Sequence, residues 1–154
     1  MSKDIMHKQL TISIAILLML LSNNSLAAKI NNHKYHDYRA EYIAIDLLKM
    51  QTFHLQQAKI KLDNNQATHA WGDLAYLLCH IPNHYEALQQ MQDLAIQLNK
   101  QEEMLKFYDK ATSVFPNDAK AHALYGLYLA KMGDSNKATE HIDIALDLDP
   151  SIMN

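Results

Sequence analysis

Hydrophobic and polar positions follow two different patterns along this chain. Near the start, residues 10–21 form a stretch of mainly apolar side chains. From about residue 37 onward, apolar side chains instead recur every three or four positions, which is the spacing of one face of an α-helix. The first pattern predicts a targeting segment or a membrane segment, and the second predicts a helical domain.

The apolar stretch has the features of a signal peptide. It has 12 residues, fewer than the roughly 20 that a membrane-spanning helix needs. Lys3 and Lys8 precede it, and polar residues follow it up to Ser25-Leu26-Ala27, which has small residues where a signal peptidase cleaves. We therefore predict a signal peptide over 1–27, with Ala28 as the first residue of the mature protein. An uncleaved membrane anchor is the alternative.

The rest of the chain contains a repeat. Its three prolines, Pro82, Pro116 and Pro150, are 34 residues apart in both intervals, and Ala111 and Ala145 keep the same step. A fixed period of this length is typical of stacked helical units. The pattern divides the chain into three units, over 51–84, 85–118 and 119–152.

Each unit is predicted to form two helices. In the last unit, an apolar stripe that includes Tyr125 and Leu129 ends before Gly133, a residue that readily adopts the positive φ found after a helix. A second stripe through Ile142 ends before Pro150, which cannot continue a helix. Two such amphipathic helices cannot bury their apolar faces alone, so neighbouring units must stack.

The last unit resembles the tetratricopeptide repeat. The resemblance rests on the positions of Gly126, Gly133-Asp134, Ala138 and the run 145–150. The middle unit departs from the family pattern at Gln92, where a small residue is usual, and the first unit has Leu77 where the others have alanine. The resemblance implies an all-α fold, a tetratricopeptide-type solenoid of helical hairpins, over 51–152.

Residues 28–50 do not fit a fourth unit. An apolar stripe nevertheless runs from residue 37 to residue 62 without glycine or proline, and Asp37 is suited to an N-cap. We predict an N-terminal helix that continues into the first repeat helix or kinks just before it. The stripe consists of Tyr38, Tyr42, Ile45, Leu48, Leu55 and Leu62.

Composition narrows the class of protein. The 154 residues are 49% hydrophobic and 20% charged, which excludes a disordered chain, and they include only 3 glycines and 3 prolines. The formal net charge of −3 gives no reason to expect a nucleic-acid partner. A single cysteine excludes an internal disulfide.

No combination of residues predicts catalysis, a cofactor or a metal site. His33 and His36 are close in sequence but lack a third ligand, and His80 and His84 lie on either side of a proline. We expect the lone Cys79 to face solvent, and no general base for it is evident. The remaining helical histidines are interpreted as surface or boundary residues; they are His54, His69, His122 and His141.

The resemblance also implies a binding groove lined by the first helix of each repeat. Its basic clamp for a C-terminal carboxylate is missing, because the matching positions are mainly glutamine and acidic residues. Glutamine side chains can instead hydrogen-bond to an extended peptide. The groove candidates are Thr52, Leu55, Gln56, Lys59, Glu86, Gln89, Gln90, Asp93, Gln97, Lys120, Ala123 and Leu127.

A second candidate interface lies at the C-terminal end. Repeat arrays usually finish with a polar capping helix, but only four residues follow Pro150 in this sequence. Ile142, Ala145 and Leu146 are expected to face their own hairpin, which leaves Ile144 and Leu148 for self-association or for a partner.

Together these features predict a non-enzymatic adaptor of the bacterial cell envelope, periplasmic or secreted, that binds a peptide or helix of an envelope protein. It would contact a membrane only through an uncleaved signal peptide. The alternative is a periplasmic metal-handling or stress protein that uses its 9 histidines and 8 methionines.

Overall fold

The computed structural model describes residues 35–40 and 45–153. The predicted signal peptide, its cleavage site after Ala27 and the candidate ligand His33 lie outside these residues, as does Tyr42 of the N-terminal stripe. The predicted division of the chain into a signal segment and three units therefore stays a prediction.

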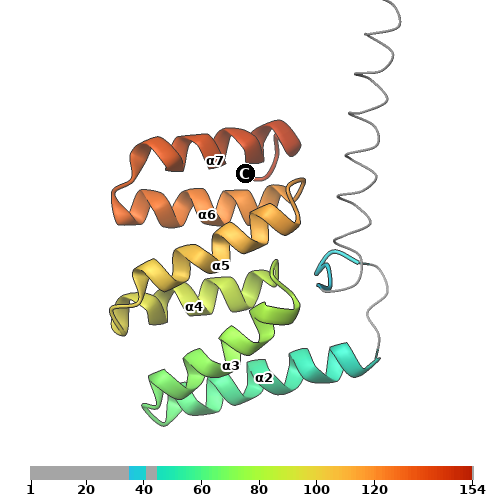
Figure 1. Ribbon diagram of the computed structural model, residues 1–154, viewed down its shortest axis with the longest axis vertical. Helices are drawn as coiled ribbons and strands as arrows, with labels where there is room; N and C mark the ends of the chain where they lie inside the picture. The colour runs from blue at the N-terminus through green and yellow to red at the C-terminus, as the bar shows by residue number, and fades with distance from the viewer. Residues whose placement is uncertain (1–34, 41–44, 154) are drawn as a thin grey trace, which may run out of the picture. The chain divides into compact units, whose positions relative to one another are not determined.

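In the part of the chain that the structure describes, six helices form three consecutive hairpins, stacked one on the next (Figure 1). Each hairpin pairs a first helix with a second helix that runs back along it. The described residues contain no β-strand, so the predicted all-α solenoid of helical hairpins is confirmed. The pairs are α2 (Ile45–Asp63) with α3 (Ala67–His80), α4 (Tyr85–Gln97) with α5 (Gln101–Val114), and α6 (Ala119–Met132) with α7 (Ser135–Leu148).

The same turn closes all three hairpins. Its central residue has a positive φ in each case: Asn65 (58°), Asn99 (55°) and Gly133 (87°), again 34 residues apart. Glycine and asparagine adopt this left-handed conformation at low cost. In each turn, the next residue donates its backbone N–H to a carbonyl five positions earlier, which satisfies an otherwise unpaired group at the helix end. These bonds are Gln66 to Lys61 (2.7 Å), Lys100 to Ala95 (2.7 Å) and Asp134 to Leu129 (3.0 Å).

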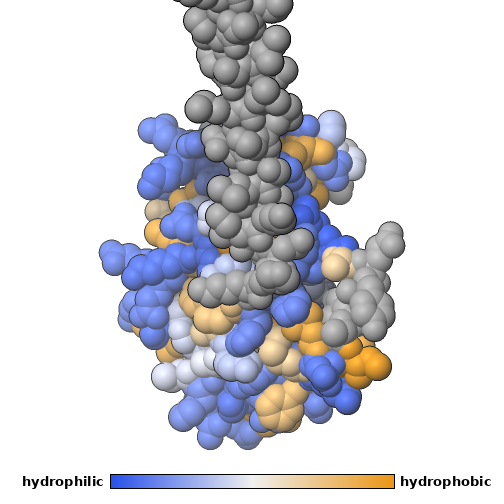
Figure 2. Space-filling model, turned by 45° about the vertical axis from the view of Figure 1, so that its right-hand side comes forward, coloured by the Kyte–Doolittle hydropathy of each residue, from blue (hydrophilic) through white to orange (hydrophobic). Residues whose placement is uncertain are grey.

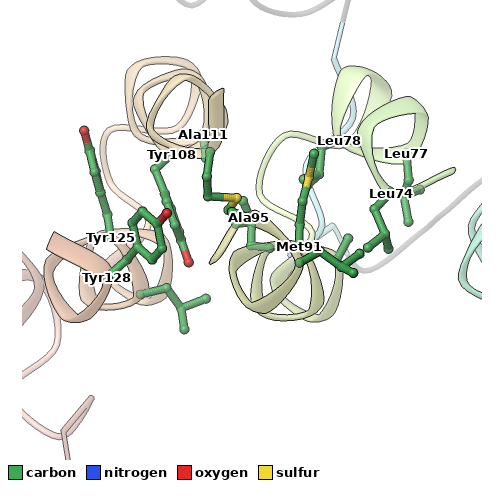
Figure 3. Close-up of a cluster of buried hydrophobic side chains, with 14 of the residues drawn as sticks. Leu74, Leu77, Leu78, Met91, Ala95, Tyr108, Ala111, Tyr125 and Tyr128 are labelled. Carbon is green, nitrogen blue, oxygen red and sulfur yellow. The ribbon is translucent and has the colours of Figure 1, made fainter. Parts of the chain in front are cut away.

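A continuous apolar core runs through the stack (Figure 3). The rings of Tyr108 and Tyr125 are stacked in parallel with centroids 5.1 Å apart, so the second and third hairpins share an aromatic contact. Trp71, Tyr108, Tyr125 and Tyr128 are buried in this core, whereas Tyr76 is 47% exposed. Labelled members of this core are Leu74, Leu77, Leu78, Met91, Ala95, Tyr108, Ala111, Tyr125 and Tyr128.

Small residues allow the helices within a hairpin to approach closely. A Cβ atom added at Gly126 would lie 2.7 Å from the side chain of Ile142 on α7. At the matching place in α4, Gln92 is half-buried, and its side-chain oxygen accepts a hydrogen bond from the Tyr108 hydroxyl at 3.0 Å. Gln92, which departs from the family pattern, thus forms a specific polar contact inside the second hairpin.

The structure differs from the prediction at the N-terminal side. Residues 37–40 form a turn and not the start of a helix, and Asp37 accepts from Arg39 N (2.9 Å) in place of capping a helix. Their contacts explain the difference, since this segment forms hydrogen bonds to the loops that join successive hairpins. From Ile45 onward α2 is one continuous helix that reaches the first turn.

None of the helices among the described residues combines the length and the apolarity needed to cross a bilayer.

Candidate functional site

The first helices α2, α4 and α6 present one row of exposed side chains, here named the first-helix face. Most of the predicted groove residues belong to it, and Gln90 is half-buried at its edge. Nine of them are exposed: Thr52, Gln56, Lys59, Glu86, Gln89, Asp93, Gln97, Lys120 and Leu127.

Two groove candidates do not belong to this face. Ala123 is only 5% exposed, because α6 packs against α4 at this point. Leu55 is half-buried and packs against the core. The Ala123 side chain is therefore not free to contact a partner, so this expectation is corrected, whereas Leu55 stays a partly exposed candidate.

Polar side chains dominate the face where α4 and α6 lie together. Gln90 donates a hydrogen bond to Glu86 at 3.1 Å. Lys131 of α6 pairs with Asp93 of α4 at 3.4 Å, and both side chains are at least half exposed. Leu127, 51% exposed, adds an aliphatic contact point. This part of the face offers both donors and acceptors around a small apolar centre.

The face is more apolar over α2. Leu48, Lys49, Thr52, Phe53 and Gln56 line an open depression of about 460 Å³. Hydrophobic side chains gather over α2 at the lower end of the view in Figure 2. A partner that covered the whole face would therefore meet an apolar end and a polar end.

A second arrangement involves residues 35–40, here named the N-terminal strap. It lies against the loops that join successive hairpins. His36 N donates to the His80 carbonyl at 2.9 Å, and Tyr38 N donates to the side-chain oxygen of Asn83 at 2.8 Å. The Tyr38 ring lies 4.4 Å from the ring of His84. The strap is thus held by hydrogen bonds from two of its backbone N–H groups and by one aromatic contact.

Asp118 connects the strap to the third hairpin. It is 1% exposed, and it accepts from Asn83 Nδ2 (2.7 Å) and from the Tyr85 hydroxyl (2.9 Å). It also caps α6 by accepting from Ala121 N at 3.1 Å. Arg39 lies 3.6 Å from it and supplies a positive charge. Burial and the nearby Asp118 carboxylate both raise the pKa of Tyr85, which keeps this hydroxyl a donor.

The charges of the strap are paired. Arg39 forms an ion pair of 2.6 Å with Asp37 and donates to the Asn117 carbonyl at 2.9 Å. Although burial opposes ionisation of Asp37, hydrogen bonds from Arg39 and Asn83 hold its pKa below the usual value. The strap is therefore anchored to two loops by charged as well as neutral hydrogen bonds.

His84 fills the equivalent N-cap position of α4. Its Nδ1 accepts from Ala87 N at 3.2 Å, so the neutral ring carries its proton on Nε2. The side chain is fully buried, and Nε2 has no hydrogen-bond partner among the described residues. Burial lowers the pKa of the imidazole to about 4. As predicted, α3 ends at His80 and α4 begins after His84, so no helix joins this pair.

His122 and His141 join the two helices of the last hairpin. Their Nδ1 atoms lie 2.9 Å apart, and His122 Nε2 lies 3.2 Å from the Pro116 carbonyl. A carbonyl can only accept, so His122 carries its proton on Nε2 and His141 donates from Nδ1. Burial lowers the pKa of both rings. His122 is 6% exposed, so its interpretation as a surface or boundary residue was wrong.

Groups suited to metal binding or nucleophilic chemistry stay apart in the described part of the chain. No three His, Cys, Asp or Glu side chains there lie close enough to hold a metal ion. Cys79 is exposed, as predicted, in a cleft of about 440 Å³ with Lys106 and Lys110. Among these residues the recognisable chemistry is hydrogen bonding and apolar contact, which suits binding.

Comparisons with known proteins identify the fold. No described protein family and no curated protein matches the chain. Among solved structures, YrrB, described as a TPR protein with an unusual peptide-binding site, is 23% identical, with a TM-score of 0.51 over 68% of this chain and 53% of that one. MamA residues 41-end from Desulfovibrio magneticus RS-1 is 23% identical, with a TM-score of 0.45 over 63% of this chain and 55% of that one.

The chain spans a little over half the length of these structures. At this level of identity the likeness concerns architecture. Together with three hairpins closed by the same turn at a 34-residue period, it identifies the fold as a tetratricopeptide-type helical-hairpin solenoid.

Proposed function

We propose that this protein is a non-enzymatic adaptor that binds a peptide or a helix of a partner protein on its first-helix face. The observation that carries the proposal is the exposure of nine predicted groove residues on three successive first helices. The solenoid supports it further, since stacked repeats of this kind use extended surfaces for binding. YrrB, which shares the fold, is itself described as having a peptide-binding site.

The chemistry of the face suggests the kind of segment it binds. Over α4, Gln89, Asp93 and Gln97 offer donors and acceptors that suit a peptide backbone. The depression beside Phe53 suits apolar side chains at the α2 end of the segment, and Leu127 adds one aliphatic contact within the polar part over α4 and α6. A partner segment with one apolar end and one mainly polar end matches this order.

Binding is tested after crosslinking in the native cell has identified a partner. Two variants are each expected to lower the affinity for the partner at least about tenfold while helicity stays unchanged. They are the triple variant Lys59→Glu, Gln89→Ala, Gln90→Ala and the single variant Leu127→Glu. Lys106→Glu on α5 is the matched control, because it changes an exposed lysine away from the face. Equal affinity of wild type and both variants would contradict the proposal.

We further propose that the adaptor acts in the bacterial cell envelope. The support is the sequence of residues 1–27, with its short apolar stretch and small residues before Ala28. N-terminal sequencing of the protein recovered from the periplasm is expected to begin at Ala28. Recovery of a chain that still contains residues 10–21 would favour a retained anchor.

A further inference from the structure

The first helix of the stack exposes apolar residues at positions that the later hairpins bury. Phe53 is 55% exposed and Ile60 is 44% exposed. They lie seven residues apart and therefore on the same side of α2. Their counterparts at the 34-residue period are almost completely buried: Ala87 (0%) and Ala121 (0%) for Phe53, and Leu94 (3%) and Tyr128 (1%) for Ile60.

The last helix has the complementary feature. Leu146 of α7 is 36% exposed, although it was expected to face its own hairpin. Its counterparts are Leu78 of α3, which is 0% exposed, and Thr112 of α5, which is 8% exposed. A further hairpin follows α3 and α5 but no further hairpin follows α7 in the described residues, and this explains the difference.

These two exposed patches are the two halves of one kind of junction. The solenoid builds this junction twice inside the chain, where α3 packs on α4 and α5 packs on α6. In each case the second helix of one hairpin meets the first helix of the next. Among the described residues, no second helix precedes α2 and no first helix follows α7, so the apolar sides of these two helices lack the neighbour that the internal junctions have.

The charges of α7 also bear on which surface it meets. Along α7, Glu140, Asp143 and Asp147 outnumber Lys137. The three lysines of α2 are each paired with an aspartate, so α2 does not repel this acidic helix. Like charges, in contrast, disfavour the approach of α7 to a second α7.

We propose that the α7 side of one copy of this chain docks on the α2 side of a second copy, head to tail, and so continues the solenoid across the interface. Leu146 of one copy then covers Phe53 and Ile60 of the next. The contact is heterologous, so each added copy exposes a new α7 side and the assembly is open-ended. This surface is separate from the groove residues of α4 and α6, but it shares Phe53 with the depression on α2, so a second copy and a partner compete at that end of the face.

Sedimentation of the full chain over a range of concentrations tests the proposal. Wild type is expected to form dimers and longer species as concentration rises. Leu146→Glu removes the α7 half, and Phe53→Glu with Ile60→Glu removes the α2 half, so each of these variants is expected to remain monomeric. Ile96→Glu on α4, a residue that is 37% exposed, is the matched control and is expected to associate like wild type.

Mixing the two monomeric variants is the decisive step. Each retains the half that the other lacks, so an equal mixture is expected to form a one-to-one dimer that does not grow. A wild type that is monomeric at every concentration would overturn the proposal, as would a mixture that stays monomeric. Association that persists in both variants would also overturn it, because another surface, such as residues 10–21, would then be responsible.

Discussion

α2 and α6 are each the first helix of a hairpin, at opposite ends of the stack, but they differ greatly in how many of their residues are buried. α6 has 14 residues, and eight of them are buried. α2 has 19 residues, and Ala58 alone among them is buried. The difference follows from their neighbours, because α6 packs against α4, α5 and α7 whereas α2 packs mainly on α3. In this fold, burial is set by position in the array more than by the apolar content of a helix.

The same comparison explains why sequence periodicity alone misjudges exposure. Ile60 and Tyr128 occupy equivalent places in their helices, yet one is 44% exposed and the other 1% exposed. An apolar stripe indicates which side of a helix can be buried. Whether anything covers that side depends on whether a neighbouring hairpin packs against it.

The largest expected difference in the free energy of unfolding is between truncation of Tyr128 and truncation of its counterpart Ile60. Tyr128→Ala should lower the free energy of unfolding by about 3–5 kcal/mol, because it opens a cavity in the core. Ile60→Ala should change it by no more than about 0.5 kcal/mol. Denaturant unfolding of monomeric protein measures both. Tyr128→Phe is the control and should be nearly neutral, since the Tyr128 hydroxyl has no partner among the described residues.

Acidification is expected to lower the free energy of unfolding through His84, the N-cap of α4. The folded state holds His84 neutral with a pKa of about 4, below the value of 6.5 for a free imidazole, so the unfolded chain takes up its proton first. Stability is therefore full above about pH 7 and falls by up to about 3 kcal/mol as the pH drops to 4. Burial of His122 and His141 acts in the same direction.

His84→Asn separates the contribution of this ring from the others. Asparagine can cap α4 in the same way but does not titrate. Unfolding free energies measured between about pH 7 and pH 4 should fall less steeply for this variant than for wild type. Parallel curves for the two proteins would show that His84 is not the responsible group.

Enlarging a small core residue should have a moderate effect that differs along the stack. Ala111→Leu is expected to cost about 1–3 kcal/mol, because Ala111 is fully buried in the middle hairpin. Ala145→Leu should cost less within that range, since α7 is covered on fewer sides and can shift. Thermal melts compare the two, with Ala130→Leu at an exposed site of α6 as control. A larger loss for Ala145→Leu would contradict the comparison.

The smallest effect concerns the strap. Arg39→Ala removes the exposed ion pair with Asp37, the hydrogen bond to the Asn117 carbonyl and the positive charge 3.6 Å from Asp118, so we expect a loss of about 0.5–1 kcal/mol in the free energy of unfolding. Hydrogen exchange should show faster exchange at Tyr38 N without a change in α6. If the substitution speeds exchange in α6 as much as in the strap, Arg39 supports the whole stack and the prediction is wrong.

The helices and their order could be predicted because the signals are local and repeated. Pro82, Pro116 and Pro150 mark the ends of units, and Gly133 marks a turn that Asn65 and Asn99 repeat. The exposure of Gln89 and Leu127 on the first-helix face also followed from repeat position. The burial of Ala123 did not, because it depends on how closely α6 approaches α4.

The strap could not be predicted, because its contacts join distant residues and do not repeat. Tyr38 continues the apolar stripe of α2, so periodicity alone favoured a helix there. Its backbone instead bonds to Asn83, 45 residues away, and Arg39 reaches the carbonyl of Asn117, 78 residues away. One signal was available: Asn83 and Asn117 recur at the 34-residue period just before the helix caps.

The attachment of the strap to two loops also fixes an order of events during synthesis. Residues 35–40 leave the ribosome early, yet Asp118 and Asn117, which bind Arg39, are made roughly 80 residues later. At translation rates of about 5–20 residues per second, the strap waits on the order of 4–16 seconds for its complete binding site. Its complete docking can therefore occur only after the first two hairpins and the start of the third have been synthesised.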